Sequence, residues 1–438
     1  MTKKVRDSLL IIFAVLFVGL TIFISLYASG YRFNLTWPVK PGHLLVKTGM
    51  LSIDTTPNGA YIYLNDKMQM PSYTKGIFTT PEKIKSLMPG EYNLQLEKDG
   101  YWPVKKRVRI ESGQTTFIED ITLFKIESPL KLSSLSTKTI GISPDNRHLY
   151  IADENKMLNL RNNEEISLGL GQQEIQWLKG GDKLLINGEV VSLTGDNNNT
   201  NYKEILGLET HNWFLDETRN YLYYQNKNTI NYFDINNKSN VVIVSNEKYL
   251  DYIPYNDSLF TITERGERKY LTEYSLQNKE IKTEIELPAS ADYKIRDNIQ
   301  GWLSVYDGKN QSLYLFNPQQ TENKEVINNI KNWQWINRYQ LIYSNDFEIY
   351  LLDLRSNNST LITRMGEEIQ SIMYNEKYNY LVFSTNQHLN VIDLRTDNIT
   401  TIFTAEDIQS PVLDKKTNTL YFSAKIDEEI GIYSILVK

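Results

Sequence analysis

The chain contains 438 residues with a mass of 51.0 kDa, a length that allows about two to four domains. Its 47 basic and 53 acidic residues give a formal net charge of -6, so no general attraction to nucleic-acid phosphates is expected. It contains no cysteine, which excludes disulfides, thiolate zinc sites, iron–sulfur clusters and cysteine nucleophiles.

A long apolar segment lies near the N-terminus. Residues 8–28 read SLLIIFAVLFVGLTIFISLYA and contain no charged side chain. At about 1.5 Å per residue, a helix of this length spans about 30 Å, the thickness of the hydrocarbon core of a bilayer. The segment has no polar face, unlike a helix buried in a soluble protein. We therefore predict a transmembrane helix over residues 8–29, with the lipid bilayer as its partner.

Basic residues set the expected orientation of this helix. Lys3, Lys4 and Arg6 precede it, so the positive-inside rule predicts that residues 1–7 lie in the cytoplasm and that the later domains lie outside. Residues 126–438 contain 31 basic and 43 acidic residues. The negative charge is therefore expected to lie far from anionic lipid headgroups.

A cleavable secretory signal is the alternative to an anchor. Ala28, Ser29 and Gly30 are small residues at a position where a signal peptidase could cut. A signal peptide usually has an apolar core of about 7–15 residues, which is shorter than this segment. The length favours an uncleaved anchor in a bacterial cytoplasmic membrane, and either reading exports most of the chain.

The next domain is predicted to consist of short strands. Residues 30–47 contain two prolines and are expected to form a linker. From residue 48 to 125, apolar and polar residues alternate, as they do where Ala60, Ile62 and Leu64 share one face of a strand. Turns rich in proline, glycine and asparagine separate these runs. We predict a small antiparallel β-sandwich over residues 48–125.

Several motifs of this domain resemble the bacterial PEGA domain. They are Thr56-Pro57-Asn58-Gly59-Ala60, Thr80-Pro81, Leu87-Met88-Pro89-Gly90-Glu91-Tyr92 and Lys98-Asp99-Gly100-Tyr101. Two departures are Asn58, where the family motif has glutamate, and an extended insert at residues 67–79. The resemblance implies a small extracytoplasmic β domain of an envelope-associated protein, usually without an assigned ligand.

The motif residues are interpreted as structural rather than ligand-binding. Glycine and proline fit special backbone geometries in turns, and the tyrosine fits packing at a turn. The predicted structural positions are Pro57, Asn58, Gly59, Ala60, Pro89, Gly90, Gly100 and Tyr101.

The remaining residues, 126–438, contain an internal repeat. Apolar strands begin with leucines that recur about every 39 residues, at Leu149, Leu184, Leu222, Leu259, Leu303, Leu341, Leu381 and Leu420. Each is followed by a second apolar strand, and no long amphipathic helix is present. This period with several strands per unit is typical of a β-propeller, in which neighbouring sheets bury each other's faces.

Eight blades are predicted, with seven as the alternative because the first and last repeats are weaker. A strand from around residues 129–136 would complete the last blade and latch the ring. Residues 141–150, which include Ser143-Pro144-Asp145, are similar to the turn between strands in WD-type propellers. The predicted fold is therefore all-β apart from one N-terminal transmembrane helix, with a PEGA-like sandwich followed by the propeller.

The sequence contains no recognisable catalytic motif. The histidines have no metal-binding spacing, and the sequence lacks a paired-histidine zinc helix, a phosphate loop, a nucleophile elbow and a dinucleotide glycine motif. Residues 196–200 only faintly resemble a calcium loop and are interpreted as a solvated loop. No catalytic, cofactor-binding or metal-binding residue is predicted, and no cofactor. The histidines are His43, His148, His211 and His388.

Three further sets of residues receive structural interpretations. Adjacent acidic pairs are expected to be solvated turn charges: Glu164-Glu165, Glu367-Glu368 and Glu428-Glu429. Aspartates that end second strands are expected to cap turns: Asp234, Asp353 and Asp393. Five tryptophans are expected to be buried between blades, with a sugar-stacking platform as the alternative: Trp177, Trp213, Trp302, Trp333 and Trp335.

The combined features lead to one functional hypothesis and two alternatives. The favoured function is that of a non-enzymatic, membrane-anchored extracytoplasmic protein whose propeller binds a protein or a cell-envelope polysaccharide. The first alternative is an extracytoplasmic enzyme acting on carbohydrate or peptide with a site on the propeller loops. The second is an architectural component of the envelope. Nucleic acid is not expected as a partner.

Overall fold

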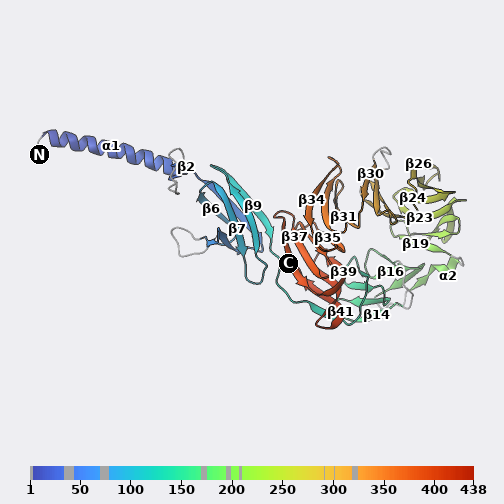
Figure 1. Ribbon diagram of the computed structural model, residues 1–438. Helices are drawn as coiled ribbons and strands as arrows, with labels where there is room; N and C mark the ends of the chain where they lie inside the picture. Colours follow the sequence, from blue (N-terminus) through green and yellow to red (C-terminus); the bar gives the residue numbers. More distant parts are fainter. Residues whose placement is uncertain are drawn as a thin grey trace.

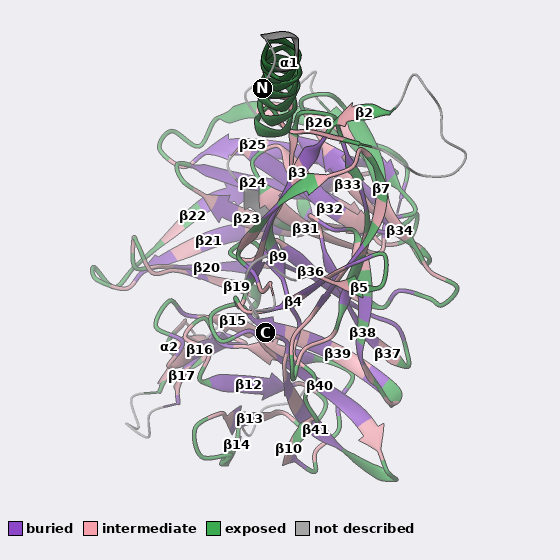
Figure 2. Cartoon of the chain, turned by 90° about the vertical axis from the view of Figure 1, so that its left-hand side faces the viewer, coloured by how far each residue is buried: buried purple, intermediate pink, exposed green. Residues whose placement is uncertain are grey.

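The computed structural model describes residues 3–33, 44–69, 78–168, 175–193, 199–206, 210–290, 292–299, 301–317 and 324–438. Three parts follow one another along the chain: a long helix, a small sandwich and a large ring of sheets (Figure 1). The helix α1 (Lys3–Ala28) is long and apolar enough over Arg6–Ala28 to cross a membrane. That stretch is not buried in the structure, and the visible turns of the helix are coloured as exposed in Figure 2.

The predicted linker contains two short strands. Strand β1 (Tyr31–Phe33) pairs antiparallel with β2 (Leu45–Lys47). Residues 34–43, which include His43, lie outside the described part of the chain. Directly after β2, the Thr48 backbone N–H donates to the Gly30 carbonyl at 2.9 Å. The chain therefore returns to the end of the helix before the sandwich begins.

The sandwich contains two sheets, ordered β6-β3-β9 and β5-β4-β7-β8. Its strands are β3 (Gly49–Thr56), β4 (Tyr61–Leu64), β5 (Lys67–Met68), β6 (Glu82–Leu87), β7 (Gly90–Glu97), β8 (Val104–Ile110) and β9 (Thr115–Thr122). Ala60, Ile62 and Leu64 are buried in the core between the sheets, as their alternation predicts.

The prediction of a purely antiparallel sandwich is wrong at one pair, because β3 and β9 are parallel. Strand β8 belongs to the other sheet and runs toward the helix, so β9 must return in the same direction as β3. The sequence pattern shows which face of a strand is buried but not which strand is its neighbour.

The ring contains eight four-stranded sheets within the described residues, and each is one propeller blade. Blades 1 to 4 comprise β11 (Ile140–Ile142), β12 (His148–Ile151), β13 (Lys156–Asn159) and β14 (Glu165–Ser167); β15 (Ile175–Trp177), β16 (Lys183–Ile186), β17 (Glu189–Ser192) and β18 (Thr200–Asn201); β19 (His211–Asp216), β20 (Tyr221–Asn226), β21 (Thr229–Asp234) and β22 (Ser239–Ser245); and β23 (Lys248–Tyr255), β24 (Ser258–Arg265), β25 (Arg268–Ser275) and β26 (Ile281–Leu287). A short helix, α2 (Tyr202–Leu206), follows blade 2.

Blades 5 to 8 continue the same pattern. They comprise β27 (Tyr293–Ile299), β28 (Trp302–Asp307), β29 (Ser312–Phe316) and β30 (Lys324–Asn328); β31 (Asn332–Asn337), β32 (Gln340–Ser344), β33 (Glu348–Asp353) and β34 (Asn358–Arg364); β35 (Ser371–Asn375), β36 (Tyr380–Ser384), β37 (His388–Asp393) and β38 (Asn398–Thr404); and β39 (Glu406–Asp414), β40 (Thr419–Ile426) and β41 (Glu429–Leu436). The last blade is completed by β10 (Leu130–Ser133), which pairs antiparallel with β41. The predicted latch is confirmed.

Apolar packing between neighbouring blades explains the leucine repeat. All eight predicted leucines lie at the start of the second strand of a blade or within it, and each has 0% of its surface exposed. Buried clusters join each blade to the next, and one of them joins blade 8 to blade 1 through Tyr421, Ile432 and Leu149. The repeat therefore marks the interior between sheets that cannot bury both faces alone.

The sandwich is docked on blades 7 and 8 through an aromatic contact. Phe124 follows β9, is 2% exposed and meets the ring of Tyr380 edge-on at a centroid distance of 5.5 Å. Trp102, from the turn before β8, packs on the same cluster. The core between blades 7 and 8 thus includes two aromatic side chains from the sandwich, Phe124 and Trp102.

Polar contacts complete the junction. The Thr122 backbone N–H donates to Asp393 Oδ2 at 2.7 Å, and Lys106 Nζ donates to the Arg395 carbonyl at 2.9 Å. The Lys125 backbone N–H donates to the Val437 carbonyl at 3.0 Å. The backbone therefore remains hydrogen-bonded as the chain passes from one domain to the next.

We predict that Phe124→Ala lowers the thermal unfolding midpoint of the protein in calorimetry. Deleting a buried phenylalanine ring typically costs about 3–5 kcal/mol, because it removes apolar contacts and leaves a cavity. Phe117→Ala is the matched control, since Phe117 lies on the preceding strand and is 62% exposed. Equal shifts for the two variants would contradict the docking of Phe124.

Candidate functional site

A polar cavity lies in the central channel and contains two cations, Lys294 and Arg296, the second of which lies 5.9 Å from the ring centroid of Tyr306. It has a volume of about 630 Å³ and is formed by the first strands of blades 2 to 5 together with the turn between β16 and β17. Its lining residues are Ile175, Gln176, Leu185, Asn187, His211, Asn212, Trp213, Phe214, Asp251, Tyr252, Ile253, Lys294, Ile295 and Arg296. The cavity is thus assembled from four separate repeats.

Three charged side chains face this cavity, and only the acidic one is tied to the backbone. Asp251 Oδ1 accepts the Tyr252 N–H at 3.0 Å, and Oδ2 accepts the Ile295 N–H of the next blade at 2.8 Å. Across the described residues, neither Lys294 nor Arg296 forms an ion pair. The cavity therefore has an excess of positive charge within an acidic propeller.

Neutral polar groups surround these cations. The Gln176 amide is used by the fold, because it both donates to and accepts from the Leu215 backbone, at 2.9 and 2.8 Å. Asn212 Nδ2 donates to Gln225 Oε1 at 2.9 Å. In the described part of the chain, the side chains of Asn187 and His211 make no hydrogen bond, so they remain available to a ligand.

An aromatic wall is fixed beside the polar groups. The indole of Trp213 lies directly on Gly188, where an added Cβ would come within 2.7 Å of the ring. On its other side the indole lies 5.3 Å from the ring of Tyr224. Gly188 also has a φ of +82°, which favours glycine. The ring is therefore held in one orientation at the cavity wall.

The cavity lies in the half of the channel farther from the sandwich. In an antiparallel four-stranded blade, the first and third turns lie at one end and the second turn lies at the other. The sandwich contacts the first and third turns of blade 7, near Tyr378 and Asp393. His211 and Lys294 lie at the beginning of first strands, at the opposite end. The cavity thus faces away from the PEGA-like side.

In the other half of the channel, an arginine forms ion pairs and a lysine donates to a hydroxyl group. A cavity of about 400 Å³ there contains Arg219, which forms ion pairs with Asp257 at 2.8 Å and Asp216 at 3.5 Å. Lys179 Nζ donates to the Thr218 hydroxyl at 2.8 Å. These groups are satisfied by the protein itself.

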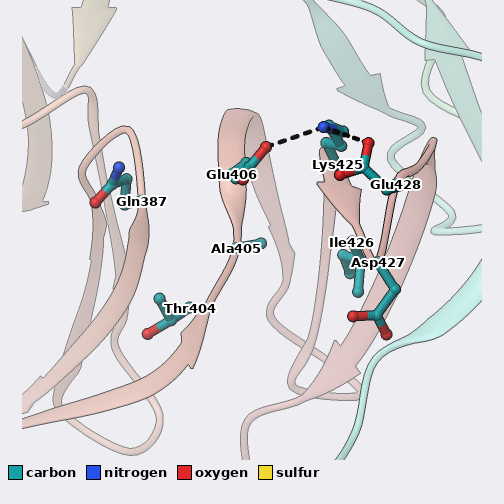
Figure 3. A pocket seen from close by; sticks show the side chains of 8 residues that line it. All are labelled: Gln387, Thr404, Ala405, Glu406, Lys425, Ile426, Asp427 and Glu428. Atoms are coloured by element: carbon teal, nitrogen blue, oxygen red, sulfur yellow. Dashed lines mark ion pairs between the residues drawn. The ribbon is translucent and has the colours of Figure 1, made fainter.

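A groove of about 680 Å³ between blades 7 and 8 has the opposite charge character (Figure 3). Its single lysine, Lys425, lies between Glu406 at 3.2 Å and Glu428 at 2.8 Å, and these carboxylates raise the pKa of the ammonium. Asp427 adds a further negative charge to the groove. Glu428 and Glu429 are solvated, as predicted, and both also form ion pairs.

The other acidic pairs also form surface contacts. Glu165 accepts from the Ser133 hydroxyl at 2.7 Å, and Glu368 pairs with Lys331. Glu367 accepts from Thr385 at 2.6 Å and lies 2.9 Å from His388 Nδ1, contacts that lower the pKa of the carboxyl group. Within the described residues, no group of three or more histidine, cysteine or acidic side chains could hold a metal ion.

The predicted structural residues have the following positions. Pro57 and Asn58 lie in the turn after β3; Gly59 and Gly100 have positive φ values of 89° and 78°; Ala60 is fully buried; Pro89 and Gly90 lie at the start of β7; and Tyr101 packs against the sandwich core. Asp234, Asp353 and Asp393 each accept backbone N–H groups of their own turns, as predicted. The five tryptophans all pack in clusters between blades. Residues 194–198, and with them most of the weak calcium-loop match, lie outside the described part.

Sequence reasoning missed the cavity residues Lys294 and Arg296. Their spacing of two along a strand gives them a common face, and their strand comes first in a repeat, so it lines the channel. The leucine repeat marks the second strand of each blade, so it does not identify the residues of the first strand. His211 and Trp213 were singled out by residue type, but no sequence pattern indicates that they meet Lys294 and Arg296.

One histidine gives a prediction about pH. His148 is 6% exposed in β12, and burial lowers its pKa, an effect that the neighbouring Asp145 only partly offsets. The unfolded chain then takes up a proton near pH 6.5 while the folded chain does not, so stability present above that pH is lost as the pH falls through it. We expect a decrease of up to about 1.4 kcal/mol per pH unit in urea unfolding. His148→Gln should flatten this dependence, and an unchanged slope would contradict the assignment.

A family model matches the first of the two β domains. Residues 48–123 match the family model described as the PEGA domain, so the predicted resemblance is confirmed for this part of the chain. A search of curated proteins gave no match.

Solved structures resemble the chain at low identity. A eukaryotic initiation factor is 11% identical, with 76% of this chain and 95% of that chain covered and a TM-score of 0.49. The C-terminal WD40 domain of Sif2 is 12% identical, with 71% and 99% covered and a TM-score of 0.48. An oligogalacturonate lyase in complex with manganese is 12% identical, with 72% and 96% covered and a TM-score of 0.42. The propeller fold itself is defined by the eight sheets.

Proposed function

We propose that the protein is a membrane-anchored, extracytoplasmic binding protein whose propeller recognises an acidic cell-envelope polysaccharide. The observation that carries this proposal is the channel cavity, where Lys294 and Arg296 have no acidic partner among the described residues. The Trp213 side chain and free amide and imidazole groups lie beside them. A charged sugar chain offers complementary acid groups and hydroxyl groups.

The proposed location follows from the helix and its flanking charges. Helix α1 would provide the membrane span, and Lys3, Lys4 and Arg6 favour a cytoplasmic N-terminus. The PEGA domain and the propeller would then lie outside a bacterial cytoplasmic membrane. The cavity, in the half of the channel farther from the sandwich, would face the surrounding envelope.

Binding without catalysis is favoured over an enzyme. Glycoside hydrolysis commonly needs two carboxyl groups on either side of the bond that is cleaved. Asp251 is the acidic residue of this cavity, and both of its oxygen atoms accept backbone N–H groups. This supports a holding role for the aspartate rather than proton transfer.

A protein ligand is the second candidate, supported by a groove between blades 5 and 6. Phe347 is 49% exposed there and lies beside Met365, and both line a cavity of about 540 Å³. An exposed aromatic ring next to a methionine is typical of protein contact surfaces.

We predict that the full-length protein in detergent binds a polyuronate or a poly(glycerol phosphate) more tightly than neutral dextran. Charge-assisted hydrogen bonds contribute about 1.5–3 kcal/mol each, so Lys294→Ala/Arg296→Ala should weaken binding at least tenfold. Isothermal titration calorimetry at two salt concentrations would measure the effect, and the two polymers distinguish carboxylate from phosphate recognition.

The control variant for this experiment is Lys416→Ala/Arg161→Ala, which removes the same charges from exposed turns. Equal affinity for dextran, or equal losses in the two double variants, would overturn polysaccharide recognition by the cavity. Shortening of the polymer during incubation would instead support the enzyme alternative. Capture of a protein that is lost in Phe347→Ala would support the second candidate.

A further inference from the structure

The end of the sandwich lies directly against the end of the helix. Thr48 donates to the Gly30 carbonyl from its backbone N–H at 2.9 Å and from its hydroxyl at 2.8 Å. The Arg32 guanidinium donates to the Tyr27 carbonyl at 3.0 Å and to the Ser86 hydroxyl of β6 at 3.1 Å. The sandwich is thus joined to α1 by side-chain and backbone hydrogen bonds, although the sequence predicts a linker there.

Apolar side chains extend from this junction beside the helix. Phe33 is 57% exposed and its ring stacks on Phe23 at a centroid distance of 6.4 Å and an angle of 14°. Phe23 lies five residues before the end of the helix, a depth of about 7 Å. Leu44 and Leu45, at the start of the paired strand, are 36% and 38% exposed. In water these apolar surfaces would be unfavourable.

Basic side chains surround the same junction. Lys47, Lys85 and Arg109 are exposed at the end of the sandwich that adjoins the helix, near Arg32. Of the acidic residues at this end, Glu111 is already paired with Arg109 at 2.8 Å. Among the described residues, Lys47 and Lys85 form no ion pair. We call this surface, formed by Phe33, Leu44, Leu45, Lys47 and Lys85, the helix-proximal surface.

We propose that the helix-proximal surface binds the headgroup region of an anionic bilayer. Phe33, Leu44 and Leu45 enter the boundary between headgroups and acyl chains, while Lys47 and Lys85 bind lipid phosphates. This rests on the proposed membrane anchoring, because only a helix that spans the bilayer brings the surface to the headgroups. Lysines close to an anionic surface are attracted to it, so removing the pair has a measurable effect on lipid binding.

The helix-proximal surface would let the PEGA domain orient the propeller relative to the membrane. A sandwich bound to the bilayer at one end and to blades 7 and 8 at the other fixes the direction of the propeller channel relative to the membrane (Figure 1). A free linker would leave this direction undefined.

The experiment uses the absence of cysteine from the chain, because one introduced cysteine is then the only thiol to label. Leu45→Cys, Gly19→Cys and Leu130→Cys in the full-length protein are labelled with the fluorophore NBD and reconstituted into phosphatidylcholine vesicles with or without phosphatidylglycerol. Position 19 lies in α1, and Leu130, which is 64% exposed, lies on the propeller.

We expect the label at position 45 to emit at shorter wavelength and to be quenched by brominated lipids as strongly as the label at position 19. The label at position 130 should emit at the wavelength that the fluorophore has in water and should not be quenched by brominated lipids. Phosphatidylglycerol should increase quenching at position 45, and Lys47→Glu/Lys85→Glu should abolish this increase. Lys309→Glu/Lys416→Glu changes the net charge equally on the propeller and should leave the increase intact.

Different failures have different meanings. If the label at position 19 is quenched while the label at position 45 behaves like that at position 130, the proposed membrane-binding surface is contradicted and the proposed membrane anchor is supported. If the label at position 19 is not quenched, both proposals are contradicted. If quenching at position 45 disappears when the protein is diluted in lipid, a second copy covers the surface and the lipid proposal is overturned.

Discussion

The hydrogen bond from Thr122 to Asp393 is the contact on which the arrangement of the domains depends. Asp393 caps its own turn through the Arg395 N–H at 2.8 Å and accepts the Thr122 N–H of the sandwich at 2.7 Å with its other oxygen. It is 1% exposed, and burial raises its pKa although both N–H groups oppose the rise. The carboxyl group of Asp393 thus accepts hydrogen bonds from both domains. Phe124, two residues after Thr122, packs in the core of the propeller.

The same segment also closes the ring. After Phe124, Lys125 bonds to Val437, and a few residues further β10 pairs with β41. Ring closure removes the exposed edges that separate blades would present to solvent. The chain therefore docks the sandwich and latches the propeller within one short stretch. A variant that disturbs the docking is expected to affect the latch as well, since the two lie within one short stretch of the chain.

The sequence predicted those features that repeat or that depend on composition. The leucine period predicted eight blades, because a residue buried between two sheets must recur once per sheet. The apolar run and the PEGA turns were predicted from short stretches of sequence. The parallel pairing of β3 and β9 was missed, because alternation does not identify a strand's neighbour. The cavity was missed for a related reason: Asn187, Trp213 and Lys294 lie in blades 2, 3 and 5 and meet only when these blades pack around the channel. The contact of Gly30 with Thr48, across a stretch that reads as a linker, had no sequence signal either.

The contacts of Thr122 and Phe124 join the sandwich and the propeller into one rigid unit. Double electron–electron resonance between nitroxide labels at Phe117→Cys and Leu361→Cys tests this rigidity directly, since both residues are exposed and the chain has no cysteine of its own. We expect a single narrow distance distribution in the full-length protein, which Phe124→Ala broadens. A broad distribution in the protein without Phe124→Ala would show that the two domains move independently and would contradict the rigid unit.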